Sequence, residues 1–234
     1  MRLSDKGADK TTRRRKPLPI EQKTRLEMIN TKYLAPFALA VTLVLGACTS
    51  SGQWQTSYND VINPAVSKNW RVVKVDVRVP ETLSVSEKNS YAPNADIVWR
   101  EDMFGNRHDQ VDAIITNAAR RGAKTLRGKR KVKLLITMIR FHALSEKARA
   151  LLSNSGVHDI AFTAQVVDAK TGKALSPVDT IRADLAAFTG VEADVAEKHG
   201  QTQKLRITNH VKNVIAGWLG HGKDVRGTFK RIGR

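Results

Sequence analysis

The side chains best suited to proton transfer lie in one short stretch of the chain. A tryptophan, an arginine, a glutamate and an aspartate follow one another there. Glu101 and Asp102, or one of them together with His142, could act as general acid and base in a hydrolase. Neighbouring side chains at the end of a strand point to opposite faces, however, which would separate the two carboxylates. We therefore expect a packed Trp99, an ion-paired Arg100 and no enzymatic activity.

The rest of the chain lacks the motifs of common enzyme classes. It contains no HExxH, no GxSxG and no dinucleotide-binding glycine pattern. Residues 217–224 (GWLGHGKD) approach a phosphate-binding loop, but Asp224 replaces the required Ser or Thr. That loop also needs a preceding strand, whereas a helix is expected here. The six histidines are scattered without metal-ligand spacing. We expect neither a metal site nor a cofactor.

The single cysteine, Cys48, directly follows an uncharged apolar stretch, residues 34–47. A helix of this length covers about 21 Å, which is less than the ~30 Å hydrocarbon core of a bilayer. Because basic residues precede the stretch and small polar residues follow it, the pattern is typical of a secretory signal. A single cysteine also excludes an internal disulfide and a cysteine-rich zinc or iron–sulfur site.

Residues 45–48 (LGAC) resemble the bacterial lipobox, in which an aliphatic residue and two small residues precede the lipidated cysteine. The resemblance implies that Cys48 becomes the mature N-terminus and carries a diacylglycerol group and an amide-linked acyl chain such as palmitate. Several acyl chains together form a stable membrane anchor. Thr49, rather than an aspartate, follows the cysteine, which favours the outer membrane. We therefore expect a periplasm-facing lipoprotein of the cell envelope.

The segment before the apolar stretch is longer than a usual signal peptide requires. Met28 offers a second start, which would give a signal peptide over 28–47 and leave 1–27 as a disordered basic extension or a mis-assigned start. The basic run 13–16 (RRRK) could belong to a twin-arginine signal or to a nucleic-acid-binding arm. The residues after it are not the bulky apolar ones that a twin-arginine signal requires.

The chain is strongly basic, with 40 Lys and Arg against 22 Asp and Glu and a formal charge of +18. Residues 1–47 hold 10 basic and 4 acidic side chains, so their removal leaves 18 − 6 = +12. Such an excess indicates an anionic partner. It is concentrated in a run of 14 residues that contains eight basic and no acidic side chains. These are Arg120, Arg121, Lys124, Arg127, Lys129, Arg130, Lys131 and Lys133.

The basic run is expected to be a docking surface for anionic lipid or for an acidic envelope protein. Basic segments gain about 1 kcal/mol per residue near anionic lipid. Nucleic acid is a less favoured partner, because no aromatic side chain for base stacking lies in the run. The alternative function is a cytosolic nucleic-acid binder that keeps residues 34–47 and uses both 13–16 and 120–133. A periplasmic hydrolase built on the carboxylates described above is a further alternative.

Alternating hydrophobicity predicts the strands of the sheet. In the strand expected over 71–79 the valines at every second position form the buried face: Val73, Val75, Val77 and Val79. The stretch 131–142 is apolar on both faces, which places it at the centre of the sheet. A third strand over 158–168 leads through a hairpin turn at 168–173 into a fourth over 174–184. Residues 95–101 form a short strand or an extended loop.

Helical periodicity appears in two places, over 107–122 and over 201–219, and a short helical insert is expected over 144–152. Gly122 is expected to close the first of these helices. The resulting β-α-β-β-β-α order predicts an α+β two-layer sandwich, with an antiparallel-rich sheet and both helices on one face. The domain is expected over 70–219, after a lipidated N-terminus and tether over 48–69 and before a basic disordered tail over 220–234.

Four segments make the chain similar to a known family: 90–93 (SYAP), 95–102 (ADIVWRED), 140–149 (RFHALSEKAR) and 201–203 (QTQ). They resemble an uncharacterised family of alphaproteobacterial lipoproteins, and the resemblance extends over about residues 53–220. It implies secretion and a single domain, and it brings no catalytic residues. The order of elements also resembles small envelope lipoproteins that assist transport or assembly machines, which is an analogy at the level of the fold.

Overall fold

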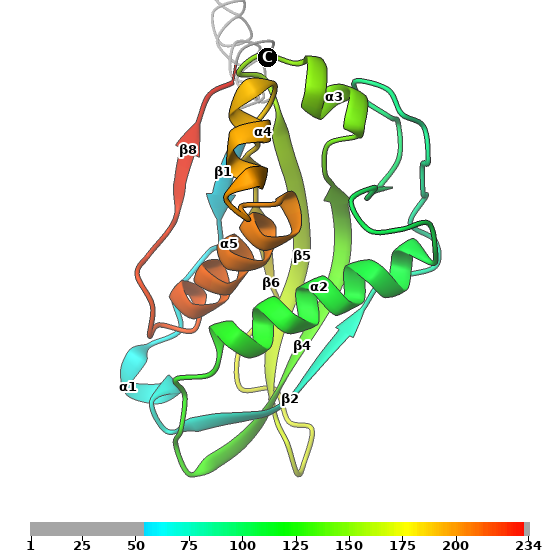
Figure 1. The fold of residues 1–234 in the computed structure, drawn as a ribbon. Helices are drawn as coiled ribbons and strands as arrows, with labels where there is room; N and C mark the ends of the chain where they lie inside the picture. The colour runs from blue at the N-terminus through cyan, green and yellow to red at the C-terminus, as the bar shows by residue number, and fades with distance from the viewer. Residues whose placement is uncertain (1–53, 232–234) are drawn as a thin grey trace, which may run out of the picture. The chain divides into compact units, whose positions relative to one another are not determined.

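The computed structural model describes residues 54–231, which form one eight-stranded sheet with helices packed against it (Figure 1). The strands are β1 (Trp54–Ser57), β2 (Trp70–Arg78), β3 (Ile97–Val98), β4 (Arg130–His142), β5 (Val157–Asp168), β6 (Asp179–Ala183), β7 (Leu185–Ala186) and β8 (Gly227–Phe229). The helices are α1 (Pro64–Ser67), α2 (Arg107–Gly122), α3 (Glu146–Leu151), α4 (Val191–Lys198) and α5 (Gln203–Trp218).

Neighbouring strands follow the order β2-β4-β5-β6-β1-β8, with β3 paired to β4 and β7 paired to β5. Within the described residues, the β2–β4 and β3–β4 pairs are parallel and the other pairs are antiparallel. The predicted α+β class with an antiparallel-rich sheet is therefore confirmed. The short strand or loop expected over 95–101 contains β3, and the helical insert expected over 144–152 contains α3. The short elements β1, β7, β8, α1 and α4 were not expected from the sequence.

Helices α2 and α5 cover one face of the sheet and pack against each other (Figure 1). The prediction of a helix over 107–122 is confirmed, because α2 has these bounds. The helix begins after Asn106, whose side chain accepts a hydrogen bond from the backbone N–H of His108 at 2.9 Å. Thr202 caps α5 in the same way. The apolar stripes of both helices are buried as expected: Val111, Ile114, Ile115 and Ala118 on α2, and Ile207, Val211, Val214 and Trp218 on α5.

Gly122 ends α2, as predicted, but it is needed for a different reason. It does not adopt the left-handed conformation typical of a glycine that closes a helix. A Cβ atom on Gly122 would lie 2.7 Å from the carbonyl oxygen of Lys212 and 3.0 Å from Cβ of Ile215, both on α5. The missing side chain therefore allows the two helices to approach each other closely.

The central position of β4 is confirmed, because β2 and β5 flank it. Although the stretch is apolar on both faces, only one face is fully buried. Val132, Leu134, Ile136 and Met138 are buried under the helices, whereas Ile139 is 42% exposed and the side chains between them are half-buried. The second face of the sheet therefore lacks a packed helical layer over this part of β4.

The expected valine face of β2 is partly wrong. Val75 is buried, but Val73 is 49% exposed. The pairing of β2 with β4 shifts its register between Val72 and Lys74, so a bulge interrupts the alternation. An extra residue in one strand turns the following side chains to the other face, and periodicity alone does not reveal it.

The domain predicted over 70–219 is too short at both ends, because paired strands lie before residue 70 and after residue 219. Within the expected tether over 48–69, β1 pairs with β6. Within the expected tail over 220–234, β8 pairs with β1, and Trp54 lies opposite Phe229. The polar composition of these two segments favoured the prediction of a tether and a disordered tail. A short polar segment can nevertheless form a strand when its backbone hydrogen-bonds to a neighbouring strand.

The hairpin after β5 forms as predicted, since the Asp168 side chain accepts hydrogen bonds from the backbone N–H groups of Lys170 and Thr171, and Gly172 has a φ of +73°. The next strand begins at Asp179 rather than at 174. Pro177 has no backbone N–H to donate to the sheet, which is consistent with this later start.

Candidate functional site

Basic side chains converge on a groove between β2 and the C-terminal end of α2. The groove encloses about 360 Å³ and is lined by apolar residues of β2 and of the loop after α2. We call its five cationic lining residues the basic groove: Arg71, Lys74, Arg120, Lys124 and Arg127. No carboxylate is among the residues that line it. Arg71 and Lys74 come from the strand, whereas the other three come from the helix end and its loop.

The loop that carries Arg127 is held against the start of β2 by backbone hydrogen bonds. The N–H of Gly128 donates to the carbonyl of Trp70 at 2.8 Å, and the N–H of Arg130 donates to the carbonyl of Asn69 at 2.9 Å. A Cβ atom on Gly128 would lie 2.0 Å from the carbonyl carbon of Asn69, so only glycine fits at this position. This close contact places the basic loop beside the first residues of β2.

The structure brings together only part of the predicted basic run. Arg120, Lys124 and Arg127 line the groove. Lys129 lies exposed in the adjoining loop, while Lys131 and Lys133 continue along β4, where they pair with Arg71 and Lys74 of β2. Like charges directly opposite each other on neighbouring strands are destabilising, so this arrangement does not serve the stability of the sheet.

Two members of the predicted run are engaged elsewhere. Arg121 donates a hydrogen bond to the side chain of Asn209 on α5 at 3.0 Å. Arg130 forms an ion pair with Asp168 at 3.1 Å. Backbone hydrogen bonds, first from Thr171, together with Arg130 lower the pKa of Asp168 to about 2. That carboxylate is therefore ionised at neutral pH and balances the charge of Arg130.

The groove contains two cations that the sequence interpretation missed, Arg71 and Lys74. Lys74 alternates with the valines of the strand predicted over 71–79, which was the available signal for this residue. Arg71 falls on the same face as those valines in a regular strand, so the alternation gave no signal for it. Lys74 forms an ion pair with Asp76 at 2.8 Å, and both side chains are more than half exposed. Within residues 54–231, the other four cations of the groove take part in no ion pair.

Three of these cations, Arg71, Lys74 and Arg120, also have an ordinary structural explanation. β2 is an edge strand, and charged side chains on an edge prevent pairing with another molecule. Arg120 lies in the last turn of α2, where a cation interacts favourably with the helix dipole. Neither effect requires that the strand and helix cations line one groove, so their convergence is the feature that indicates ligand binding.

The two carboxylates considered for catalysis stabilise the start of α5 instead. The backbone N–H of Lys204 donates to Glu101 at 3.1 Å, and Nζ of Lys204 lies 2.8 Å from Asp102. Both carboxylates thus contact the same residue, and the expectation that they point to opposite faces is wrong. Trp99 is fully buried, as expected, and its indole N–H donates to Asp102 at 2.9 Å.

The charges around this segment are satisfied by protein partners. Burial raises the pKa of Asp102, but hydrogen bonds from Lys204 and Trp99 outweigh burial and leave that pKa below its ordinary value. Arg100 is ion-paired as predicted, with Glu146 at 2.5 Å and with Glu87 at 3.2 Å. Among the described residues, Asp102 and Arg100 therefore each have a partner of opposite charge.

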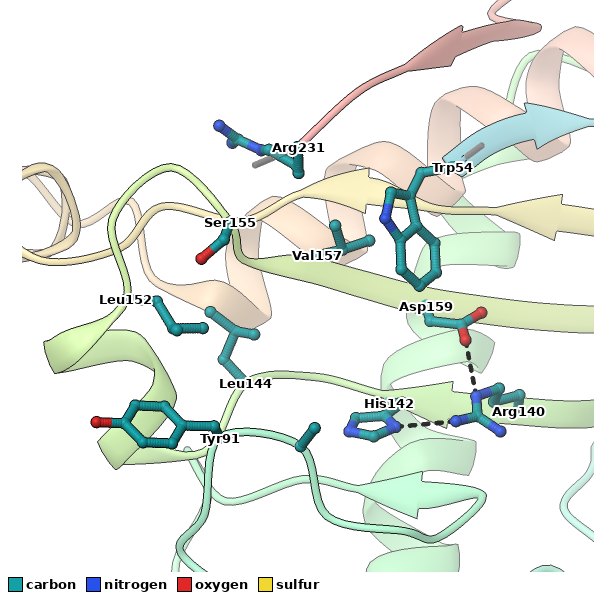
Figure 2. Close-up of a pocket in the computed structure, with 11 residues that line it drawn as sticks. Trp54, Tyr91, Arg140, His142, Leu144, Leu152, Ser155, Val157, Asp159 and Arg231 are labelled. Carbon is teal, nitrogen blue, oxygen red and sulfur yellow. Dashed lines mark hydrogen bonds and ion pairs between the residues drawn. The ribbon is translucent and has the colours of Figure 1, made fainter. Parts of the chain in front are cut away.

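His142 lies in a different place, a pocket of about 330 Å³ that we call the sheet-face pocket (Figure 2). Its ring Nδ1 is 3.1 Å from the guanidinium of Arg140. Glu101 and Asp102 are not among the residues that line this pocket. The three groups proposed for a hydrolase therefore share no pocket in the described part of the chain.

Cys48, the predicted lipidation site, and the signal peptide predicted over 28–47 lie outside the described residues. Between residues 54 and 231, no helix combines the length and apolar character needed to cross a membrane. In the same part of the chain, no three His, Asp or Glu side chains are grouped so that they could hold a metal ion.

A model described as a family of unknown function (DUF6778) matches residues 70–234. No curated protein matches the sequence. Among solved structures, the chain is similar to a protein from Xanthomonas campestris described by the family model DUF330, with a TM-score of 0.36 and 12% identity, over 68% of this chain and 88% of that chain.

Two further solved structures are similar. One is a PelC dodecamer from Paraburkholderia phytofirmans, with a TM-score of 0.31 and 9% identity, over 69% of this chain and 96% of that chain. The other is a candidate lipoprotein from Caulobacter crescentus, with a TM-score of 0.26 and 16% identity, over 46% of this chain and 81% of that chain.

Proposed function

For this chain, which belongs to a family of unknown function (DUF6778), we propose the role of a non-catalytic binding module that holds an acidic protein partner in its basic groove. The module is anchored in the cell envelope through Cys48 and faces the periplasm. The observation that carries the proposal is the convergence of five cations from β2 and α2 on one groove without a lining carboxylate. A partner with clustered Asp and Glu would match this surface.

The location of the groove favours an acidic protein over the lipid of the anchoring membrane. Trp54, which follows Cys48 by six residues, lies near Val157 in the sheet-face pocket. Lys133, which pairs with Lys74 of the groove, lies opposite Val167 on the same strand β5. The 10 residue steps from Val157 to Val167 span about 33 Å at ~3.3 Å per step. The groove is therefore at the end of the sheet away from Trp54, the first described residue after Cys48.

Replacing Arg120, Lys124 and Arg127 together by glutamate should weaken binding of an acidic polypeptide about 100-fold. Each exposed ion pair contributes up to about 1 kcal/mol, and three charge reversals remove three of them. The probe is fluorescently labelled poly-L-glutamate, titrated in low salt and followed by anisotropy. Binding to the unmodified chain should also weaken as salt is raised.

The matched control reverses three exposed lysines outside the groove, Lys88, Lys198 and Lys230. This variant has the same change in net charge, so it should lose less than about threefold in affinity if the groove is the site. An equal loss in both variants would show that only net charge matters. Stronger binding to duplex DNA or to phosphatidylglycerol vesicles than to poly-L-glutamate would favour the rival partners.

The Cys48→Ser substitution should leave an unprocessed precursor and prevent lipidation, because the lipidated sulfur atom is missing. The intact mass of the native protein should correspond to a chain that begins at Cys48 and carries acyl groups, and this mass should disappear in the variant. Mass spectrometry of the N-terminus from membrane and soluble fractions measures both. An unchanged mature mass in the variant, or a native protein that retains residues 34–47, would contradict the anchor.

A further inference from the structure

The sheet-face pocket combines apolar walls with a charged floor. Figure 2 shows Arg140 and His142 on β4 and Asp159 on β5, with Trp54 and Arg231 above them in this view. The apolar wall includes Tyr91, Leu144 and Leu152. Residues from the first and last described segments of the chain thus meet over strands β4 and β5. A volume of about 330 Å³ is at the lower end of the range for ligand pockets.

The pocket carries an excess of positive charge. Arg140 forms an ion pair with Asp159 at 2.8 Å, and Asp159 is shared with Arg182 at 3.3 Å. Asp159 is the sole carboxylate among the lining residues. Arg231 has no ion pair within residues 54–231: one Nη donates to the carbonyl of Ala187 at 2.9 Å, and its buried Nε has no hydrogen-bond partner there. A buried donor without a partner is costly, which points to a missing acceptor.

The position of the pocket and the side chains near it suggest that the acceptor for Arg231 belongs to a membrane lipid. The six-residue connection from Cys48 to Trp54 spans at most about 21 Å, so the lipid anchor would hold this end of the domain near a bilayer. Leu152 lines the pocket, and its neighbour Leu151 on α3 is 63% exposed; Val191 on α4 is 79% exposed. The two helices contact each other, and the N–H of Gly190 donates to the carbonyl of Arg149 at 2.7 Å.

These apolar side chains, together with a tryptophan and a tyrosine, are typical of surfaces at the membrane–water interface. A ligand that matches the pocket needs one anionic group for Arg231 and an apolar portion for the walls around Trp54 and Leu152. Guanidinium groups bind phosphate oxygens with two parallel hydrogen bonds, which a phospholipid headgroup can accept.

From these features we propose that the sheet-face pocket binds the anionic headgroup of a phospholipid, with Arg231 as the phosphate-binding residue and Trp54 against the apolar part of the molecule. This inference rests on the proposed anchoring through Cys48, which brings the pocket to the bilayer. It gives the two ends of the domain different ligands: lipid at the pocket and an acidic protein at the basic groove.

The fluorescence of Trp54 reports on the pocket selectively. The chain contains four tryptophans, of which Trp70, Trp99 and Trp218 are 2%, 0% and 1% exposed, respectively. The experiment titrates the purified full chain with dihexanoylphosphatidylglycerol below its micelle concentration and follows tryptophan emission. The emission should change with saturation, and a Trp54→Phe variant should abolish the change.

The Arg231→Gln variant should bind the phosphatidylglycerol analogue about tenfold more weakly, because one charge-assisted contact is lost. The matched control Arg78→Gln, an exposed arginine outside the pocket, should bind like the unmodified chain. As a second surface variant, Tyr91→Glu places a carboxylate on the rim at a residue that is 50% exposed, and it should also weaken binding. Circular dichroism establishes that each variant is folded.

Titrations with glycerol 1-phosphate and with dihexanoylphosphatidylcholine separate the possible sources of the signal. An equal response to free glycerol phosphate would overturn a lipid site, and an equal response to the zwitterionic lipid would overturn the role of the anion. Unchanged affinity in Arg231→Gln would overturn the proposal itself. The titration does not require lipidation, so a failure of the Cys48 anchor would appear only in the mass and fractionation measurements.

Discussion

Lowering the pH from 7 to 4 should reduce the free energy of unfolding by several kcal/mol, and two buried histidines are responsible. Burial, followed by repulsion from Arg206 and other cations, lowers the pKa of His158 to about 3. Burial likewise lowers the pKa of His210 to about 4, although a hydrogen bond to the backbone of Asp184 acts in the opposite direction. Both residues are therefore neutral in the folded protein at pH values where the unfolded chain is protonated.

The sign follows from the number of protons that each state binds. In the unfolded chain a histidine takes up its proton as the pH falls through about 6.5, while the folded state stays neutral until about pH 4 or 3. Stability is therefore lost progressively below pH 6.5, by roughly 3 kcal/mol for each histidine at pH 4. Asp184 acts in the opposite direction, because burial raises its pKa and the folded state gains a proton there first.

Urea unfolding at pH values between 7 and 4 measures this dependence, and His158→Phe is the informative variant. Both ring nitrogens of His158 are buried without a hydrogen-bond partner in the described residues, so a phenyl ring removes no hydrogen bond there. The variant should lose about half of the pH dependence between 6.5 and 4, and its stability at pH 7 should be equal or higher. A pH profile identical to that of the unmodified chain would exclude His158 as the titrating group.

The substitution Trp218→Ala should lower the free energy of unfolding by about 3–5 kcal/mol, the range observed when a large aromatic side chain is removed from a core. Trp218 is 1% exposed at the end of α5, and its indole N–H donates to Asp179 at 3.1 Å. Asp179 is itself 4% exposed and also accepts hydrogen bonds from Asn59. The variant therefore leaves a cavity and removes one donor from a buried carboxylate.

The matched control for this prediction is Trp54→Ala, which truncates a half-buried tryptophan on the wall of the sheet-face pocket. It should cost about 1 kcal/mol or less, because most of the surrounding space is already open. Urea midpoints at an unchanged denaturant slope measure both effects. Equal losses in the two variants would contradict the packing of Trp218 in the core.

Patterns within one segment of the sequence predicted those helices that bury one continuous apolar face. The apolar stripe of α2 and its Asn106 cap lie within 17 consecutive residues, so the sequence contains the complete signal for that helix. The bulge in β2 was not predictable, because it depends on the register with β4, a strand about 60 residues further along the chain. The strands β1 and β8 were missed for a related reason, since each is ordered chiefly by its partner.

The candidate site likewise has some features that are set by consecutive residues and others that are set by tertiary contacts. The basic run over 120–133, the candidate lipobox at Cys48 and the absence of enzyme motifs are properties of consecutive residues, and the sequence determined them by itself. Tertiary structure decided which charges act together. Parallel pairing of β2 with β4 places Arg71 and Lys74 beside the basic run, and α5 brings Lys204 to Glu101 and Asp102.

The sheet-face pocket depends entirely on tertiary structure, because its lining extends from Trp54 to Arg231 and no segment of the sequence contains it. The physical reason is that hydrophobic periodicity specifies which face of an element is buried, but not which distant element covers it. Long-range pairing is selected by the packing and backbone hydrogen bonding of the whole domain. The sequence thus predicted an anionic partner, and the fold determined which basic side chains lie together in the groove and the pocket proposed to bind anionic ligands.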